Sequence, residues 1–298
     1  MHSPRKWTRP ALAAKATAGA AFVAGTRAAL EQIAANAAGA ASGRDPEFLH
    51  QLRVGVRRLR SALRAFRGLL RRRRADSAER PWRAMMQTLG SARDWDLFQR
   101  ILEPGELQSA ALKRRTEAQH RARLLVNSPR FRETHRRTLA WAESRPWRRH
   151  SDPAEPLPDF ARRTLQRLHE NLRIPALGID WSDAARRHRV RVRVKRMRYG
   201  CELFVSAFPR GRARVFLQGL RGLQDILGEL NDIAVQRALL RKLAGRGSPP
   251  RIVEAEATVR ARLASREREL IAALEPAWAD FEARLPFWGK PAAVRARG

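Results

Sequence analysis

The sequence HQLRVGVRRLR, at residues 50–60, returns as HRVRVRVKRMR at residues 188–198. A second motif follows each copy, LGSARD at residues 89–94 and LGELND at residues 227–232. Both pairs keep one offset, because 188 − 50 = 138 and 227 − 89 = 138. Two motifs that return in register indicate an internal duplication of a unit about half as long as the chain.

Each basic stretch predicts an amphipathic helix with a basic side next to an apolar side. Residues that recur three and four positions apart share one face at about 100° per residue. The apolar side carries Leu52, Val56, Leu59, Leu63 and Phe66 in the first copy and Val190, Val194, Met197, Cys201 and Phe204 in the second. Cations follow the same period beside it, one turn or about 5.4 Å apart. They are His50, Arg53, Arg57, Arg60 and Arg64 in the first copy and His188, Arg191, Lys195 and Arg198 in the second.

Two further arginines of the motif, Arg58 and Arg196, fall outside the basic side. We expect them to pair with acids on neighbouring helices or to face solvent. A single run of arginines on a helix is often only a solvated face. Because residue type and phase both repeat, we interpret the basic side as a duplicated site for anions.

The charge of the chain points to a polyanionic partner. Its 298 residues include 61 Lys and Arg against 29 Asp and Glu, which gives a net charge of +32. Only six of the cations are lysines, and the planar guanidinium of arginine suits two-pronged contacts with phosphate. Self-repulsion of this size burdens a compact state unless an anion offsets it. The candidates are nucleic acid, an anionic membrane surface and inorganic polyphosphate.

The composition predicts an all-α protein with two four-helix bundles, since Ala, Leu, Arg, Glu and Gln dominate and alternating β-branched runs are scarce. We expect a first bundle over residues 10–143, a proline-rich linker over 144–158, a second bundle over 159–285 and a flexible tail over 286–298. Within the bundles we expect helices at about 10–38, 45–73, 78–102, 106–126, 130–143, 159–173, 182–207, 210–243 and 250–284. The sequence has no apolar run long enough to span a membrane.

The sequence gives little support for a metal, a cofactor or a disulfide. The single cysteine, Cys201, falls on an apolar side, where we expect a core residue. Neither motif histidine has a second histidine or a carboxylate in a typical metal-binding arrangement, although Glu47 lies near His50. Asp225, Glu229 and Asp232 share a helical face, but we favour ion pairs over a Mg²⁺ site there because the first half lacks this set. We therefore expect no metal, no cofactor and no catalytic residue.

The second motif predicts how its helix packs. A glycine inside a helix destabilises it by about 1 kcal/mol relative to alanine, so the repeated Gly90 and Gly228 suggest close helix–helix approach. We expect Asp94 and Asp232 to hold an arginine of the basic helix in place.

The pattern HxxRVxxRRLR followed by LGxxRD, and then both again, resembles the CHAD family, the conserved histidine α-helical domain. The resemblance covers about residues 10–285. It implies two helical bundles related by a pseudo-two-fold axis, with a basic central channel that binds inorganic polyphosphate. The implied phosphate contacts are His50, Arg53, Arg57, Arg60, His188, Arg191, Lys195 and Arg198, and the family's tyrosine beside the second motif is Tyr199. Arg64 extends the same basic side.

Two features depart from the family pattern. Members are often joined to a triphosphate-hydrolysing CYTH domain, whose Glu-x-Glu-x-Lys signature does not occur here. Lys195 stands where the first copy has Arg57, which keeps the charge and loses the two-pronged geometry.

These patterns favour a non-enzymatic, cytoplasmic protein that binds polyphosphate and is targeted to polyphosphate granules. An alternative is a nucleic-acid binder without sequence specificity, although no helix-turn-helix or RNA-module motif occurs. A less favoured alternative is an enzyme that acts on polyphosphate or triphosphate. The sequence leaves open the oligomeric state, the preferred chain length and the physiological anion.

Overall fold

The computed structural model describes residues 3–8, 10, 12, 15–244 and 249–289, and these residues form helices without any strand. Their nine α-helices are α1 (Ala18–Ser42), α2 (Pro46–Ala65), α3 (Arg72–Phe98), α4 (Glu106–Asn127), α5 (Pro129–Glu143), α6 (Leu157–Arg173), α7 (Ala184–Phe204), α8 (Arg210–Leu243) and α9 (Pro250–Glu282). Three single 3₁₀ turns extend them at Gln99–Ile101, Ile174–Ala176 and Val205–Ala207. Within the described ranges, no helix has the length and apolarity needed to cross a bilayer.

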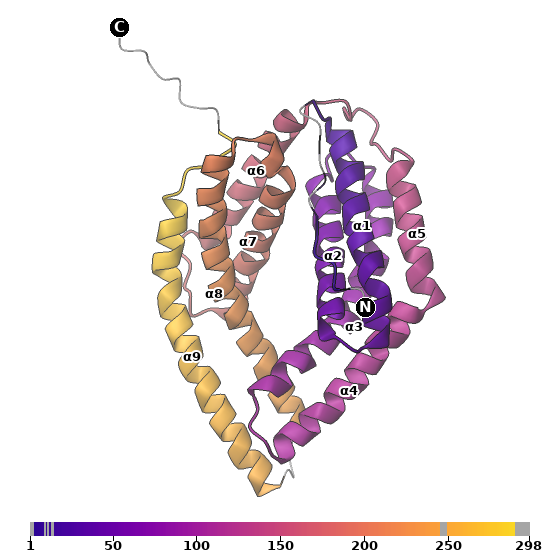
Figure 1. The fold of residues 1–298 in the computed structure, drawn as a ribbon. Helices are drawn as coiled ribbons and strands as arrows, with labels where there is room; N and C mark the ends of the chain where they lie inside the picture. Colours follow the sequence, from indigo (N-terminus) through magenta and orange to yellow (C-terminus); the bar gives the residue numbers. More distant parts are fainter. Residues whose placement is uncertain (1–2, 9, 11, 13–14, 245–248, 290–298) are drawn as a thin grey trace.

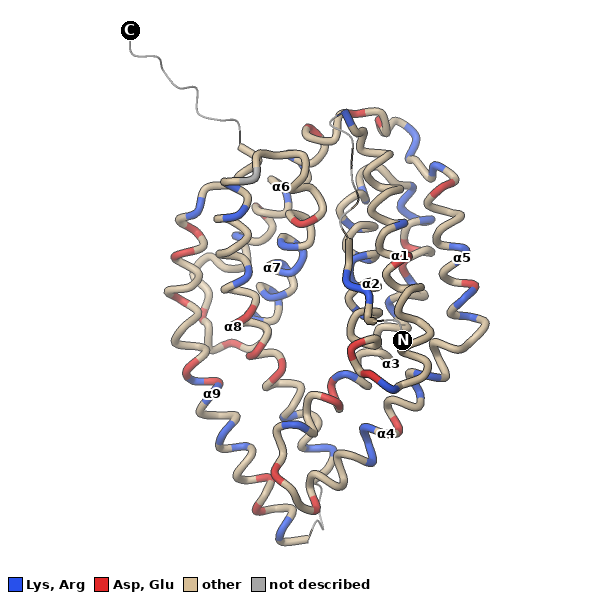
Figure 2. The backbone as a smooth tube through the Cα atoms, in the orientation of Figure 1, with Lys and Arg blue, Asp and Glu red and all other residues tan. Residues whose placement is uncertain are grey.

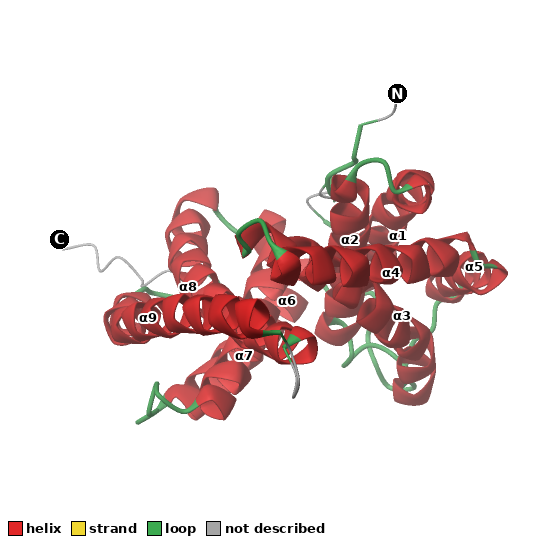
Figure 3. Cartoon of the chain, turned by 90° about the horizontal axis from the view of Figure 1, so that it is seen from below, coloured by secondary structure: helices red, strands yellow, loops and turns green. Residues whose placement is uncertain are grey.

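The helices form two groups that lie side by side (Figure 1). The first half consists of α1–α5 and the second half of α6–α9, and Figure 3 shows the same division from below. Contacts between the halves join α2 to α7, α3 to α8 and α4 to α9. The two helices that carry the repeated basic motif therefore pack directly on each other.

Side-chain caps fix where the basic helices begin. Asp45 accepts a hydrogen bond from the backbone N–H of Glu47 at 2.8 Å, and Pro46 follows as the first helical residue. Asp183 caps α7 in the same way, accepting from Ala185 at 2.8 Å. The equal start of both helices gives their basic residues the same phase.

A continuous hydrophobic core joins the two halves. The predicted apolar sides of α2 and α7 are confirmed, since every one of their residues is at most 2% exposed. Where α2 ends, Phe66 stacks on Phe160 of α6 at 5.1 Å and meets Phe204 of α7 edge-on at 5.3 Å. Phe22 of α1 approaches Phe66 at 5.6 Å. These four rings, the seam aromatics, fix how α2 and α7 are placed against each other.

Several helix ends differ from the predicted positions. The first helix begins at Ala18 rather than near residue 10, because Thr17 caps it with its hydroxyl. A turn after Phe66 ends α2 at Ala65, well before residue 73. Ala-rich and Arg-rich stretches favour helix almost everywhere, so composition alone did not locate these ends.

The segment between the halves and the end of the chain also differ in detail from the expected boundaries. The connection is anchored to the first half, because the N–H of Ala18 donates to the carbonyl of Glu155 and that of Arg148 to Leu69, both at 2.9 Å. The expected tail from residue 286 begins inside the fold, where Phe287 and Trp288 are buried. Their rings pack near Phe216. Residues 290–298 lie outside the described part.

Candidate anion-binding site

The charge of Arg57 on α2 acts on cations of both helices, namely Arg53, Arg191 and Lys195. Figure 2 shows Lys and Arg positions along both helices, on either side of the middle of the molecule. Burial lowers the pKa of Lys195 to about 7, and the charges of Arg191 and Arg57 act in the same direction. Burial also lowers the pKa of Arg53 to about 10, with Arg57 adding to the effect. The two helices thus bring Arg53, Arg57, Arg191 and Lys195 together, and we name these residues the cation cluster.

No acid among the described residues forms an ion pair with a member of the cation cluster, although acids neutralise its neighbours. The Nε–H groups of Arg53 and Arg191 are buried and have no hydrogen-bond acceptor in the described part of the chain. Arg57 donates to the hydroxyl of Tyr199, at 3.3 Å. Buried donors without an acceptor are uncommon in folded proteins and need an explanation. An anionic ligand would supply the missing negative charge.

The other cations of the two basic sides are already paired. Arg60 and Arg64 both bind Glu79 of α3, at 3.0 and 2.5 Å. Arg198 lies 3.1 Å from Glu202, one turn further along α7. All three paired arginines follow the cation cluster toward the C-terminal ends of α2 and α7, so the predicted contacts divide into an unpaired group and a neutralised group.

The arginines outside the basic side behave as predicted. Arg58 of α2 pairs with Glu202 of α7 at 2.8 Å and so ties the two halves together. The ring of Trp7 covers its guanidinium at 4.2 Å, a contact that nothing in the sequence pattern indicated. Arg196, its counterpart in the second motif, is exposed.

The two motif histidines lie in different surroundings. His50 is half-buried, and burial lowers its pKa, with Arg93 and Arg53 adding to the effect and Glu47 opposing it. His188 is exposed. A neutral His50 beside the cation cluster can donate or accept a hydrogen bond without adding charge.

The acids of the second motif do not bind the basic helices directly, which corrects the expectation for Asp94 and Asp232. Neither carboxylate forms an ion pair with Arg53 or Arg191 in the described residues; both act on these arginines only through their charge. Burial raises the pKa of Asp94, and Asp232 raises it further, while Arg53 and Arg191 oppose this. Both acids therefore lie near the cation cluster without neutralising any of its members by contact.

A different acid, Asp96, is the ion-pairing centre of this region. Its carboxylate is 2% exposed and binds Arg93 at 2.9 Å, Arg115 at 3.0 Å and Arg100 at 3.4 Å. The repeat did not indicate this acid, because the matching position in the second half is Ala234. Its only signal was a carboxylate beside Trp95 on the buried side of a predicted helix.

The glycines of the second motif also correct an expectation. A Cβ built on Gly90 or Gly228 would meet nothing within 4 Å, so close helix packing does not explain them. Other glycines do serve packing, since a Cβ on Gly55 would lie 2.9 Å from Ile33 and one on Gly200 would lie 2.7 Å from Leu168.

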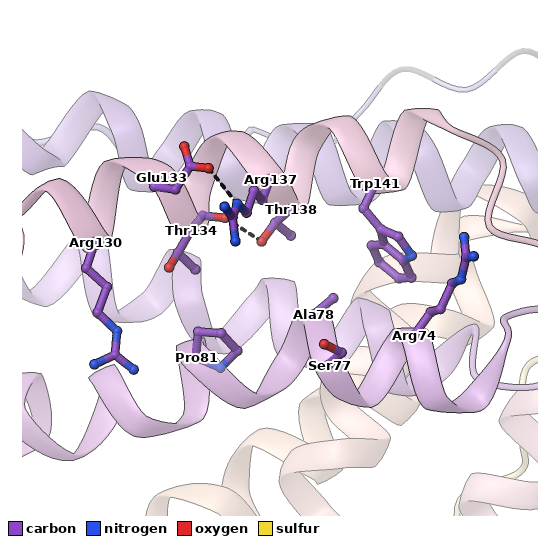
Figure 4. A pocket seen from close by; sticks show the side chains of 10 residues that line it. All are labelled: Arg74, Ser77, Ala78, Pro81, Arg130, Glu133, Thr134, Arg137, Thr138 and Trp141. Carbon is purple, nitrogen blue, oxygen red and sulfur yellow. Dashed lines mark hydrogen bonds and ion pairs between the residues drawn. The ribbon is translucent and has the colours of Figure 1, made fainter.

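Two hollows in the surface differ in their relation to the candidate site. One, of about 520 Å³, lies between the halves and includes Asp232 in a lining formed with Glu229, Gln236, Arg100, Arg262 and Arg266. The other, of about 430 Å³, lies on the outside of the first half between α3 and α5. Figure 4 shows Pro81 and Ser77 of α3 facing Thr134 and Trp141 of α5 there. None of the predicted anion contacts lines this outer hollow.

Of the three acids Asp225, Glu229 and Asp232, Glu229 forms an ion pair. Glu229 binds Arg266 of α9 at 2.6 Å, which lowers the pKa of Glu229. In the described ranges, His, Cys, Asp and Glu form no group of three or more that could hold a metal ion.

The fold and this site define an all-helical protein in which two basic helices pack together and leave a group of cations unneutralised by any described acid. The family model of the CHAD domain matches residues 24–241, and the chain belongs to this family. The crystal structure of the CHAD domain from the plant Ricinus communis is 31% identical, with a TM-score of 0.84 over 96% of this chain and 99% of that one.

PptA from Streptomyces chartreusis shares the fold at 17% identity, with a TM-score of 0.66 over 89% of this chain and 100% of that one. No curated protein matches the chain in sequence. The resemblance inferred from the repeated motif is therefore confirmed at the level of the family.

Proposed function

We propose that this CHAD protein binds inorganic polyphosphate and does not turn it over. The observation that carries the proposal is the cation cluster, in which two helices contribute four cations that form no ion pair with an acid of the described residues. Guanidinium and ammonium groups form their strongest hydrogen bonds with charged acceptors such as phosphate oxygens. Cations one helical turn apart suit a linear ligand that repeats its charge along its length.

We also infer that the chain is an internal duplication, with two bundles related by a pseudo-two-fold axis and a basic channel between them. Helix positions support this, because the first residues of α2 and α7 differ by 184 − 46 = 138 and those of α3 and α8 by 210 − 72 = 138. The contacts of α2 with α7 and of α3 with α8 fit such an axis. Both copies would then supply cations to one channel.

Binding of nucleic acid is the second candidate, since the net charge of +32 would attract any polyanion. The placement of the cation cluster favours a slender ligand. Polyphosphate carries no bases, so two basic helices can approach it from opposite sides, whereas a DNA duplex can contact only an outer surface. Both complexes should weaken with salt as counterions are released. Enclosure should let polyphosphate binding persist at about 0.15–0.3 M salt, where most duplex binding is lost.

Competition tests the proposal. Labelled long-chain polyphosphate is bound to the full-length protein at about 0.15 M salt and displaced by unlabelled polyphosphate, tripolyphosphate, RNA or duplex DNA. We expect polyphosphate to displace the label at the lowest phosphate concentration. If duplex DNA competes equally well, the nucleic-acid function becomes the better proposal.

The absence of turnover is tested separately. Incubation of the protein with long-chain polyphosphate and Mg²⁺ or Mn²⁺ should release no phosphate and leave the chain length unchanged. Phosphate release that disappears in Asp232→Asn would show an enzyme with a carboxylate-bound metal. The proposal places the protein in the cytoplasm, where polyphosphate granules would recruit it.

A further inference from the structure

Gly90 of α3 and Gly228 of α8 have no structural reason to be glycine in helix packing. Each lies inside a long helix, where glycine is less favourable than any residue except proline. The space beside each is open, because a Cβ there would meet nothing within 4 Å. Neither residue has a positive φ, so the backbone conformation does not require glycine either. The presence of glycine at both positions therefore needs another explanation.

Each glycine lies one helical turn before a motif acid whose charge acts on the cation cluster. Residues four positions apart share a helical face, so Gly90 lies beside Asp94 and Gly228 beside Asp232. The charge of Asp94 acts on Arg53 and Arg191, and that of Asp232 acts on Arg191 and Lys195. The helices that carry the two glycines are also in contact, since α3 packs on α8.

We infer that Gly90 and Gly228 keep a path open beside the cation cluster, so that an unbranched phosphate chain can pass close to the backbones of α3 and α8. The inference rests on the proposed function and assigns to these residues a role in selecting the ligand. A side chain at either position would extend into the space that the phosphate chain occupies. The glycines would thus select the ligand by its width, while the cations select it by its charge.

Leucine substitution tests this inference, with binding of long-chain polyphosphate to the full-length protein as the readout. Gly90→Leu and Gly228→Leu should each weaken binding on the order of tenfold, as expected when one charge-assisted contact is displaced. Neither change alters the charge of the protein. Because leucine favours helix over glycine, the melting temperature should stay the same or rise. Weaker binding in a protein of equal or greater stability is a result that a packing role would not give.

Matched controls come from the same two helices. Ala84 of α3 and Gly222 of α8 occupy equivalent positions of the two halves, and both are exposed. Each precedes its motif glycine in the same helix by the same number of residues, since 90 − 84 and 228 − 222 are equal. Ala84→Leu and Gly222→Leu should bind polyphosphate as the unaltered protein does.

The outcomes separate this inference from the proposed function. If Gly90→Leu and Gly228→Leu bind normally while Arg53→Ala and Arg191→Ala lose binding, the glycine role is wrong and the proposed function stands. If the control variants lose binding to the same degree, the idea that the two glycines set the width of the path is also wrong. If the unaltered protein binds no polyphosphate, both the function and the inference fail.

Discussion

Arg60 and Arg64 of α2 share Glu79 of the neighbouring α3, whereas Arg198 of α7 pairs with Glu202 of its own helix. The position that matches Glu79 in the second half, at the offset of the repeat, is the apolar Leu217. The two copies of the motif thus keep the same phase and have acquired different counter-ions. Core packing fixes the phase of a helix, while the partners of its surface charges can change at little cost in stability.

The two copies of the motif differ less in the cation cluster than in these outer pairs. Arg53 and Arg191 correspond to each other and both retain a buried Nε–H without an acceptor in the described residues. Arg57 corresponds to Lys195, the only member of the cation cluster that is not arginine. The property that both halves keep is therefore an unneutralised pair of cations, which is what a shared anionic ligand requires.

The largest expected effect concerns the two arginines that correspond to each other. Arg53→Ala and Arg191→Ala should each weaken polyphosphate binding on the order of tenfold or more, because a hydrogen bond to a charged group contributes about 1.5–3 kcal/mol. Titration calorimetry on both variants measures whether α2 and α7 contribute equally. Arg189→Ala, which removes the same charge from an exposed position of α7, is the control and should change little. Normal binding by both variants would show that the basic side is only solvated.

The next comparison concerns stability, at Arg58 and its counterpart Arg196. Arg58→Ala removes a partly buried ion pair with Glu202 and the contact with Trp7, so it should lower the free energy of unfolding by about 1–2 kcal/mol. Arg196→Ala should change it by less than about 0.5 kcal/mol, because that residue is exposed. Urea denaturation of both variants measures the difference. Equal losses would mean that Arg58 does not join the halves.

Lys195 makes the second half sensitive to pH. Its pKa of about 7 in the fold lies below the 10.5 of a free lysine, so its charge is lost as the pH rises from 6 to 8. A polyanion prefers the charged form, and polyphosphate affinity should therefore fall over this range by several-fold, at most about tenfold. Lys195→Arg should remove the pH dependence, since arginine stays charged. A pH dependence that persists in this variant would assign it to another group.

The same residue affects folding with the opposite sign. Between pH 7 and 10.5 the unfolded chain binds more protons at Lys195 than the folded protein does. The free energy of unfolding should consequently gain a favourable contribution from this residue as the pH rises through that window. Comparison of urea midpoints for the unaltered protein and Lys195→Met measures this contribution, which the variant should lack.

The smallest expected effect concerns Glu79, whose matching position in the second half is the apolar Leu217. Glu79→Gln releases Arg60 and Arg64 and removes a negative charge beside α2. Polyphosphate binding should tighten by about twofold to threefold at low salt, and the gain should shrink as salt is added. Weaker binding in this variant would instead show that Glu79 holds Arg60 in a useful position.

The sequence pattern was sufficient for the parts of the fold that depend on neighbours along the chain. The apolar sides of α2 and α7 follow from spacing and residue type alone, and both were found as predicted. Helix ends were harder, because a hydroxyl cap at Thr17 and a turn after Phe66 interrupt stretches that favour helix throughout.

The cations of the site could be predicted from the sequence, whereas the acids that pair with their neighbours could not. Period and repetition identified the residues that make up the cation cluster. Glu79, Glu202 and Asp96 each form an ion pair with an arginine of another helix, and no local pattern marks those pairs. The glycines of the second motif were found from their repetition, but their surroundings are known only from the three-dimensional arrangement.

The seam aromatics have a consequence for how the protein unfolds. Phe22 and Phe66 of the first half and Phe160 and Phe204 of the second form one group of touching rings. If either half melted alone, it would expose the rings of the other to water, and each buried phenylalanine contributes about 1.5–3 kcal/mol. The two halves should therefore melt cooperatively, in a single calorimetric transition, even though the sequence reads as two repeated units. If neither half keeps its fold without the other, the cation cluster, which takes residues from both, is assembled only when the whole chain is folded.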